Sequence, residues 1–183
     1  LPDGALVENA ITWRGQSQVT QAPKLPPEEE IGHLPGNWLF LGPLFGHFGH
    51  FLVESISRIW AVDALRGQID GVLYVPKFQN RPEHVADVYR PFLRALGVDL
   101  PMLNIADPVR VDRIYVPRQG FGMFQMIEGA PEFRAFIRAH AGQGIAPKGP
   151  DRIYISRSAL PAQRGSVVGE KLLEGWLQDE GYT

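Results

Sequence analysis

Hydrophobic positions follow two alternating periods from residue 37 onward. Short apolar runs bounded by Gly and Pro are typical of buried strands, and longer segments with apolar residues every three to four positions are typical of helices. The pattern predicts strands over 37–44, 71–76, 101–106, 109–117 and 151–158, and helices over 49–65, 82–96, 131–141 and 166–182. Strands that alternate with helices predict an α/β fold with a mostly parallel, helix-covered sheet.

Composition shifts divide the chain into three parts. Residues 1–36 hold one candidate hairpin, ALVENAITWRG, and a stretch rich in Pro and acid, so we expect an irregular segment there. Residues 37–148 are expected to form one domain around the mostly parallel, helix-covered sheet, and the family resemblance described below implies that this domain is Rossmann-like. The stretch GQGIAPKGP is typical of a linker, and residues 149–183 then resemble the first strand and helix of a truncated second domain. The alternative is that this last unit adds an edge strand to the first sheet.

Charge and composition narrow the class of protein. The formal net charge of the 183 residues is −2, which leaves no basic field for nucleic acid or an anionic membrane, so nucleic acid is not an expected partner. The absence of cysteine excludes disulfides, thiol catalysis and thiolate metal sites. No apolar run approaches the roughly 18 to 20 residues that span a bilayer. We therefore expect a soluble, cytoplasmic protein.

One polar seam runs along the predicted helix 49–65, which is otherwise apolar. The motif H-x-x-H-x-x-x-E places His50 and Glu54 one helical turn apart, within hydrogen-bond reach, where the pair can serve as a general base. Two other interpretations stay open: a structural polar cluster, and a metal site to which His47 adds a ligand. At 3.6 residues per turn, the seam comprises His50, Glu54, Ser57, Arg58 and Ala61.

A second polar cluster lies in DRIYISRS. Ser156, Arg157 and Ser158 stand at the carboxyl end of a predicted strand, where open α/β sheets bind ligands, and a guanidinium with hydroxyl donors suits a diphosphate. The alternative is a solvated arginine at a strand end. The Gly-rich loop 119–126 resembles a phosphate-binding loop only loosely, because the chain contains neither G-x-G-x-x-G nor a P-loop motif. We expect this loop to be mobile and to pack on itself.

Two stretches together resemble a known family. GHFGHFLVESISRIWAV resembles the segment N-x-G-H-F-L-x-E-x-L-x-R-L-W of glycosyltransferase family 61. DRIYISRS, followed by an acidic and apolar helix that ends DEGYT, resembles the segment K-I-Y-I-S-R … L-x-x-x-G-F of the same family. The family includes bacterial capsular polysaccharide biosynthesis proteins. The likeness covers residues 37–65 and 109–183, and the middle of the chain only in rhythm.

The resemblance implies an inverting transferase of the GT-B type, in which two Rossmann-like domains face each other across a cleft and a nucleotide sugar is the donor. His50, Glu54 and Arg58 match family positions on the acceptor-side domain. Ser156 and Arg157 match the S-R that begins the nucleotide-side domain.

The implied reaction gives each of these residues a role. Glu54 is expected to take the proton of the acceptor hydroxyl, His50 to tune Glu54 or exchange roles with it, and Arg58 to orient Glu54 or a sugar hydroxyl. Arg157, with Ser156, is expected to hold the departing diphosphate. No cofactor is required, although a divalent cation can accompany the diphosphate.

Two departures from the family pattern matter. His47 stands where the family usually has an asparagine, two positions before G-H, and we expect it to contact the substrate. The donor-contacting segment of the family, similar to H-G-A-G-L-T-N, is not found in the 183 residues. We therefore expect that this polypeptide alone transfers no sugar.

The expected partners are a nucleotide sugar and a glycan acceptor. Self-association is also expected, because an incomplete strand–helix unit leaves apolar side chains uncovered. Two rival functions remain: a non-catalytic α/β binding or assembly module that uses the seam as a partner contact, and a metal-dependent hydrolase built on His47, His50 and a carboxylate. The apolar face in question comprises Val167, Leu172, Leu173, Trp176 and Leu177.

Overall fold

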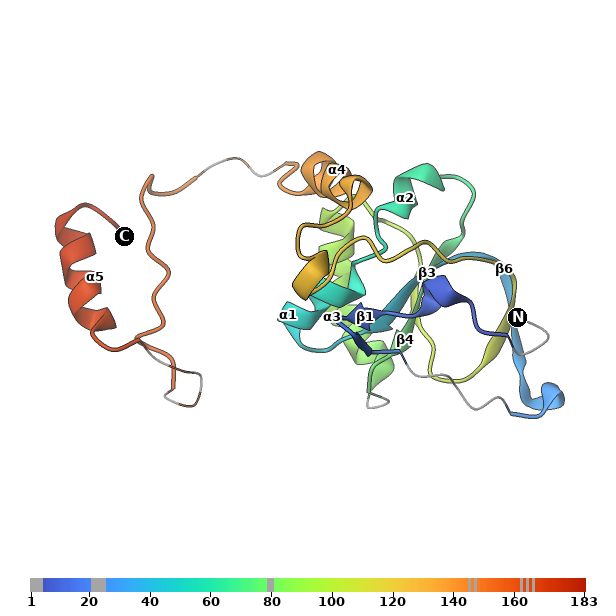
Figure 1. Ribbon diagram of the computed structural model, residues 1–183. Coiled ribbons are helices and arrows are strands. Elements are labelled where there is room, and N and C mark those ends of the chain that lie inside the picture. The colour runs from blue at the N-terminus through green and yellow to red at the C-terminus, as the bar shows by residue number, and fades with distance from the viewer. Residues whose placement is uncertain are drawn as a thin grey trace. The chain divides into compact units, whose positions relative to one another are not determined.

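The computed structural model describes residues 5–20, 26–78, 81–144, 146, 148–161, 163, 165 and 167–183. The chain forms two compact units, Leu1–Gln143 and Gly144–Thr183 (Figure 1). The boundary between them lies in the Gly- and Pro-rich stretch GQGIAPKGP.

A four-stranded sheet forms the centre of the first unit. Its strands lie in the order β5-β4-β3-β6, and every neighbouring pair is parallel. The prediction of an α/β fold with a parallel sheet is confirmed, and the order is compatible with a Rossmann-like sheet, where the strands follow the order 3-2-1-4. The strands are β3 (Gly32–Leu44), β4 (Gly71–Pro76), β5 (Met102–Asn104) and β6 (Val109–Tyr115).

Alternation along β3 gives the sheet two apolar faces. Leu39 and Leu41 belong to the large core, whereas Trp38 and Phe40, one position away, belong to a smaller cluster on the other face. The pairing register continues this division across the sheet, because Leu39 is aligned with Val72 of β4, which also lies in the large core.

Helices cover the face that carries the large core (Figure 1). Phe51 stacks on Tyr89 with ring centroids 3.8 Å apart, and both rings are buried. Buried aromatic pairs contribute strongly to packing, so this contact fixes the first helical segment against α3. The helical elements are α1 (Phe48–His50), the π-helix η3 (Phe51–Ser55), α2 (Ala61–Ala64), α3 (Pro82–Ala95) and α4 (Pro131–His140).

Irregular segments cover the second face. Ala10 of the 3-10 helix η1 (Glu8–Ala10) and Ile105 pack against the cluster that contains Trp38 and Phe40. The chain between β5 and β6 supplies Ile105 and contains no helix, whereas helical segments lie between β3 and β4 and between β4 and β5. This face therefore lacks a continuous helical layer, and two of the pockets described below lie along it.

The prediction of one continuous helix over 49–65 is wrong. The segment passes from α1 through the π-turn of η3 and a series of turns into α2. The N–H of Ile56 donates to the carbonyl of Phe51 at 3.2 Å, a step of five residues. Ser55 Oγ donates to the carbonyl of Pro43 at 2.8 Å and accepts a backbone N–H just beyond β3 at 3.0 Å. Such side-chain bonds to a neighbouring backbone compete with regular helix.

The N-terminal hairpin is shorter than the stretch ALVENAITWRG. β1 (Trp13–Arg14) pairs antiparallel with β2 (Ser17–Gln18), and the turn between them places Gly15 at φ +59°, which glycine tolerates without strain. The residues before β1 form η1 instead of a strand. Two further 3-10 turns are η2 (Glu28–Glu30) and η4 (Phe124–Met126).

The second unit contains α5 (Glu170–Asp179), which lies inside the predicted helix 166–182. The predicted strand 151–158 is not formed. The N–H of Tyr154 donates to the carbonyl of Thr183 at 3.0 Å, and the N–H of Thr183 donates to the carbonyl of Arg152 at 3.1 Å. A β-ladder needs a longer row of such pairs, so residues 151–158 do not form a strand.

Candidate functional site

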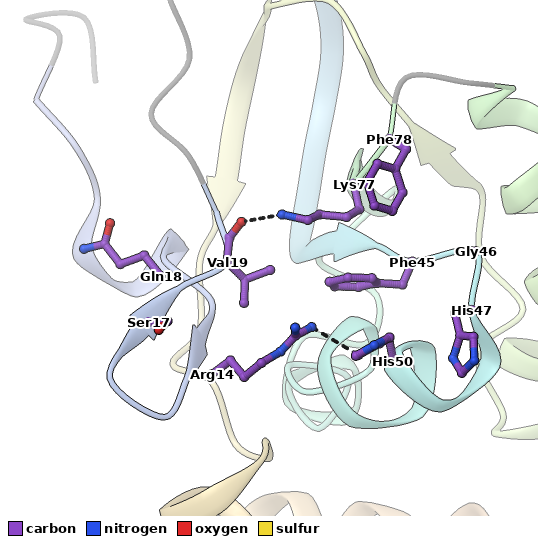
Figure 2. A pocket seen from close by; sticks show the side chains of 10 residues that line it. All are labelled: Arg14, Ser17, Gln18, Val19, Phe45, Gly46, His47, His50, Lys77 and Phe78. Atoms are coloured by element: carbon purple, nitrogen blue, oxygen red, sulfur yellow. Dashed lines mark hydrogen bonds between the residues drawn. The ribbon is translucent and has the colours of Figure 1, made fainter. Parts of the chain in front are cut away.

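A pocket of about 560 Å³ opens at the carboxyl ends of β3 and β4 (Figure 2). Open parallel sheets commonly bind ligands at this edge. The hairpin β1–β2 forms one wall, and the chain that leaves β3 through α1 forms another. The lining residues are Arg14, Ser17, Gln18, Val19, Phe45, Gly46, His47, His50, Lys77 and Phe78.

The π-turn η3 places the two central residues of the site. His50 ends α1 and Glu54 lies within η3, so the widened turn joins them. His50 Nδ1 lies 2.8 Å from Glu54 Oε2, which confirms the predicted hydrogen-bonded pair. The His50 side chain is 32% exposed and lines the pocket, whereas that of Glu54 is 0% exposed. π-Turns inside helical segments often occur at functional sites.

Arg14 binds the buried carboxylate from the opposite side. Its Nε lies 2.6 Å from Glu54 Oε1, and one terminal nitrogen lies 2.8 Å from Oε2. This hydrogen bond to Glu54 raises the pKa of Arg14, and the two parallel contacts are the geometry in which a guanidinium holds an ionised carboxylate. Glu54 is therefore a buried anion with a cation on one side and an imidazole on the other.

The position of Glu54 determines the proton on His50. A bare Nδ1 at 2.8 Å from an ionised oxygen would set two lone pairs against each other, so Nδ1 carries the proton and donates it to Glu54. The 3.1 Å approach of Arg14 to Nδ1 is then a contact between two donors. Among the described residues Nε2 has no hydrogen-bond partner. The neutral ring thus keeps Nε2 as an acceptor at the pocket wall.

Aromatic contacts hold the His50 ring in place. It stacks on Phe45 with centroids 5.1 Å apart and meets the edge of His47 at 5.4 Å. Figure 2 shows the Phe45 ring between Lys77 and Arg14, whose cationic groups lie 6.0 and 5.7 Å from its centroid. Lys77 Nζ also donates to the carbonyl of Val19 at 3.0 Å, which ties the end of β4 to the hairpin.

The expectation that Glu54 itself takes a substrate proton is not met by this geometry. Glu54 does not line the pocket, and both its oxygens bind neighbouring side chains. A general base must reach the proton that it removes. His50 faces the pocket and therefore stands where Glu54 was expected.

Arg58 is also placed differently from the expectation that it contacts a substrate. It is fully buried and donates to the carbonyls of Asn9, Ile11 and Pro117 and to the hydroxyl of Thr12, at 2.7 to 3.2 Å. Burial lowers its pKa to about 10. All three guanidinium nitrogens donate inside the protein, so Arg58 anchors the segment before β1 and does not face the pocket.

Sequence reasoning missed Arg14 and Gln119. Gln119 Oε1 accepts the N–H of Trp13 at 2.7 Å, and Gln119 Nε2 donates to the carbonyl of Trp13 at 3.0 Å. The Gln119 amide thus binds both backbone groups of Trp13, as a neighbouring strand would. These bonds hold the adjacent Arg14 beside Glu54. No local motif could reveal either residue, because their partners are 40 and 106 positions away along the chain.

Ser156 and Arg157 belong to the second unit and do not line this pocket. Ser156 Oγ donates to Glu174, and this hydrogen bond lowers the pKa of Glu174. The backbone N–H of Arg157 donates to Glu170 Oε1 at 2.9 Å. Two carboxylates therefore adjoin the position expected to hold a diphosphate, and they would repel that group.

The described residues offer neither a metal-binding cluster nor a membrane-spanning helix. There, no group of three or more His, Asp or Glu side chains is placed to hold a metal ion. At the His50 pair, the guanidinium of Arg14 occupies the space beside Glu54 where a cation would bind. Within the same residues, no helix has the length and apolar character needed to cross a bilayer.

Comparisons with protein-family models, with curated proteins and with solved structures give no match for this chain. The function proposed below is therefore argued from the geometry of this site and from the sequence motifs.

Proposed function

We propose that this chain is the acceptor-side part of an inverting glycosyltransferase related to family 61, and that His50 is its general base. The observation that carries the proposal is the carboxylate–imidazole pair at 2.8 Å, with the carboxylate buried and the imidazole at the wall of an open pocket. The strand order, compatible with a Rossmann-like sheet, supports one half of a GT-B architecture.

The proposed reaction is a single displacement at the anomeric carbon. The acceptor hydroxyl gives its proton to His50 Nε2 while its oxygen forms the new bond to that carbon, and the bond to the nucleoside diphosphate breaks. Glu54 stabilises the imidazolium that results, because its negative charge lies against Nδ1. Arg14 holds Glu54 in place, and His47 and Lys77 supply further donors along the wall.

The donor would be a nucleotide sugar and the acceptor a glycan or polysaccharide. The resemblance places the donor on a second domain, to which Ser156 and Arg157 would belong. Because carboxylates adjoin these residues, we propose that the diphosphate binds there only with a divalent cation or after Glu170 and Glu174 have moved. Otherwise the reaction requires no cofactor from this unit.

The test is sugar transfer from a panel of nucleotide sugars by the full translation product of the gene, compared with its His50→Ala variant. Loss of a general base lowers turnover by about 10²- to 10⁴-fold. The matched control is His33→Ala, because His33 pairs with Asp112 on the surface and does not line the pocket. A loss below tenfold for His50→Ala, or an equal loss for the control, would remove His50 from this role.

One observation favours a non-catalytic binding module instead: Glu54, the expected base, is 0% exposed, as are Ser57 and Arg58 of the predicted seam. Because these buried side chains cannot contact a partner, such a module would bind through the pocket wall and not through the seam. A binding module would show saturable glycan binding by the wild-type chain and no transfer under any donor. Transfer that depends on His50 would exclude it.

A further inference from the structure

A second cavity of about 530 Å³ adjoins the pocket that holds His50. The two share Gln18, Val19 and Lys77 as lining residues, so Lys77 stands where they meet. The second cavity lies between the N-terminal segment and the carboxyl ends of the central strands. Cavities of this size accommodate small organic ligands.

The walls of the second cavity are mainly apolar. Ile11 lines it from the N-terminal segment and Val75 from β4, and Phe40 contributes from the second face of the sheet. Phe40, Val75 and Ile105 also line a third hollow of about 290 Å³. The cavities therefore form one series, which runs from the pocket of His50 across the open face of the sheet.

Charge is distributed unevenly along this series. Arg14, His47, His50 and Lys77 line the first pocket, and neither the first nor the second cavity has an Asp or Glu among its described lining residues. Arg14 is neutralised by Glu54, but Lys77 forms no ion pair with the described residues. Its ammonium donates one of its three N–H groups to the carbonyl of Val19. Lys77 thus keeps a positive charge available at the entrance to the apolar cavity.

We propose that the acceptor bound here is an amphiphile with an anionic phosphate-type head and a linear aliphatic chain. The phosphate lies against Lys77 and the aliphatic chain occupies the cavity lined by Ile11, Val75 and Ile105, so that a hydroxyl of the glycan attached beyond the phosphate faces His50 Nε2. A glycan without an aliphatic chain would leave these apolar walls in contact with water, and an uncharged lipid would leave Lys77 without an ion pair. The identification of this amphiphile as the acceptor rests on the proposed function. The binding of such an amphiphile to the two cavities does not depend on that function.

Titration calorimetry of the chain with simple probes tests the binding without any sugar donor. The probes are inorganic phosphate, hexyl phosphate, decyl phosphate and decyl maltoside, each below its critical micelle concentration. Each buried methylene should tighten binding about fourfold. Decyl phosphate should therefore bind at least tenfold more tightly than hexyl phosphate, and more tightly than either inorganic phosphate or decyl maltoside.

Two variants test the contacts of the phosphate head and those of the aliphatic chain separately. Lys77→Met should weaken decyl phosphate by about 10- to 100-fold and leave decyl maltoside unchanged, because only the charge-assisted contact is lost. Ala106→Asp places a carboxylate on an exposed position that lines the second cavity, and should weaken decyl phosphate at least tenfold. Ala141→Asp, equally exposed but outside these cavities, is the matched control and should bind like the wild type.

Affinity independent of chain length, or equal for decyl phosphate and decyl maltoside, would overturn the proposal. So would equal effects of Ala106→Asp and its control. Failure of the proposed function gives a different result: decyl phosphate binds as described, yet no glycosylated product forms in the transfer assay. The reverse pattern, transfer to a glycan without decyl phosphate binding, would retain the transferase and reject the amphiphilic acceptor.

Discussion

Replacement of Glu54 by glutamine should destabilise the first unit strongly, although the two side chains have the same shape. Glu54 is fully buried, accepts two hydrogen bonds from Arg14 and accepts one from His50. Glutamine keeps one acceptor oxygen but places an NH₂ group against donors of Arg14. The partly exposed guanidinium of Arg14 then loses half of its pairing, and the amide donates to Nδ1, which moves the His50 proton to Nε2.

The magnitude follows from the lost contacts. A hydrogen bond to a charged group contributes about 1.5–3 kcal/mol, and Arg14 is 33% exposed, so water restores part of the loss. We expect the free energy of unfolding to fall by about 2–3 kcal/mol. With a urea m-value of about 2 kcal/mol/M, the unfolding midpoint should fall by about 1–1.5 M.

Urea unfolding followed by tryptophan fluorescence measures this change. The control is Glu128→Gln, which removes a surface ion pair with Arg134 from a carboxylate side chain that is 87% exposed. That variant should change stability by less than about 0.5 kcal/mol. If Glu54→Gln behaves like Glu128→Gln, Glu54 is not an ionised, paired group and the assignment of the His50 tautomer fails with it.

Three further predictions concern other parts of the chain. Arg58→Lys should lower the free energy of unfolding by about 2–3 kcal/mol, because one ammonium cannot replace a planar guanidinium that donates to several carbonyls. Urea unfolding measures this change, and an unchanged midpoint would contradict it. Burial raises the pKa of Asp63, but hydrogen bonds from His140 and Arg66 outweigh it and leave that pKa below its ordinary value. Its stabilising effect is therefore present above the ordinary pKa near 4 and is lost as pH falls through the folded-state pKa; the stability difference from Asp63→Asn should shrink as the pH falls below about 4. Self-association through the second unit should appear in light scattering and disappear in Trp176→Glu, since Trp176 is 60% exposed; a monomeric wild type at high concentration would refute it.

Much of the fold could be predicted because its signals are local. The apolar runs at 37–44 and 71–76 coincide with parts of β3 and β4, and the periodic segments at 82–96 and 131–141 coincide with α3 and α4. Each of these elements buries an apolar set whose spacing alone identifies it. Residues 151–158 have the same signal but lack a neighbouring row of partners, so no strand forms.

The site could be predicted only in part. The spacing of His50 and Glu54 indicated a hydrogen-bonded pair, because four positions make one turn. Which of the two faces the solvent depends on the π-turn and on Arg14, whose strand is brought beside Glu54 by tertiary contacts with Gln119. Arg58 shows the same limit, since only the fold of the N-terminal segment brings carbonyls to it.

The central claim is that buried Glu54 holds His50 with its proton on Nδ1 and presents a bare Nε2 to the pocket. Long-range ¹H–¹⁵N correlation NMR of the wild-type chain, at a pH where His50 is neutral, measures this directly. The predicted result is a protonated Nδ1 and an unprotonated Nε2. A protonated Nε2 in the neutral ring would contradict the account, because no acceptor for a substrate proton would then face the pocket.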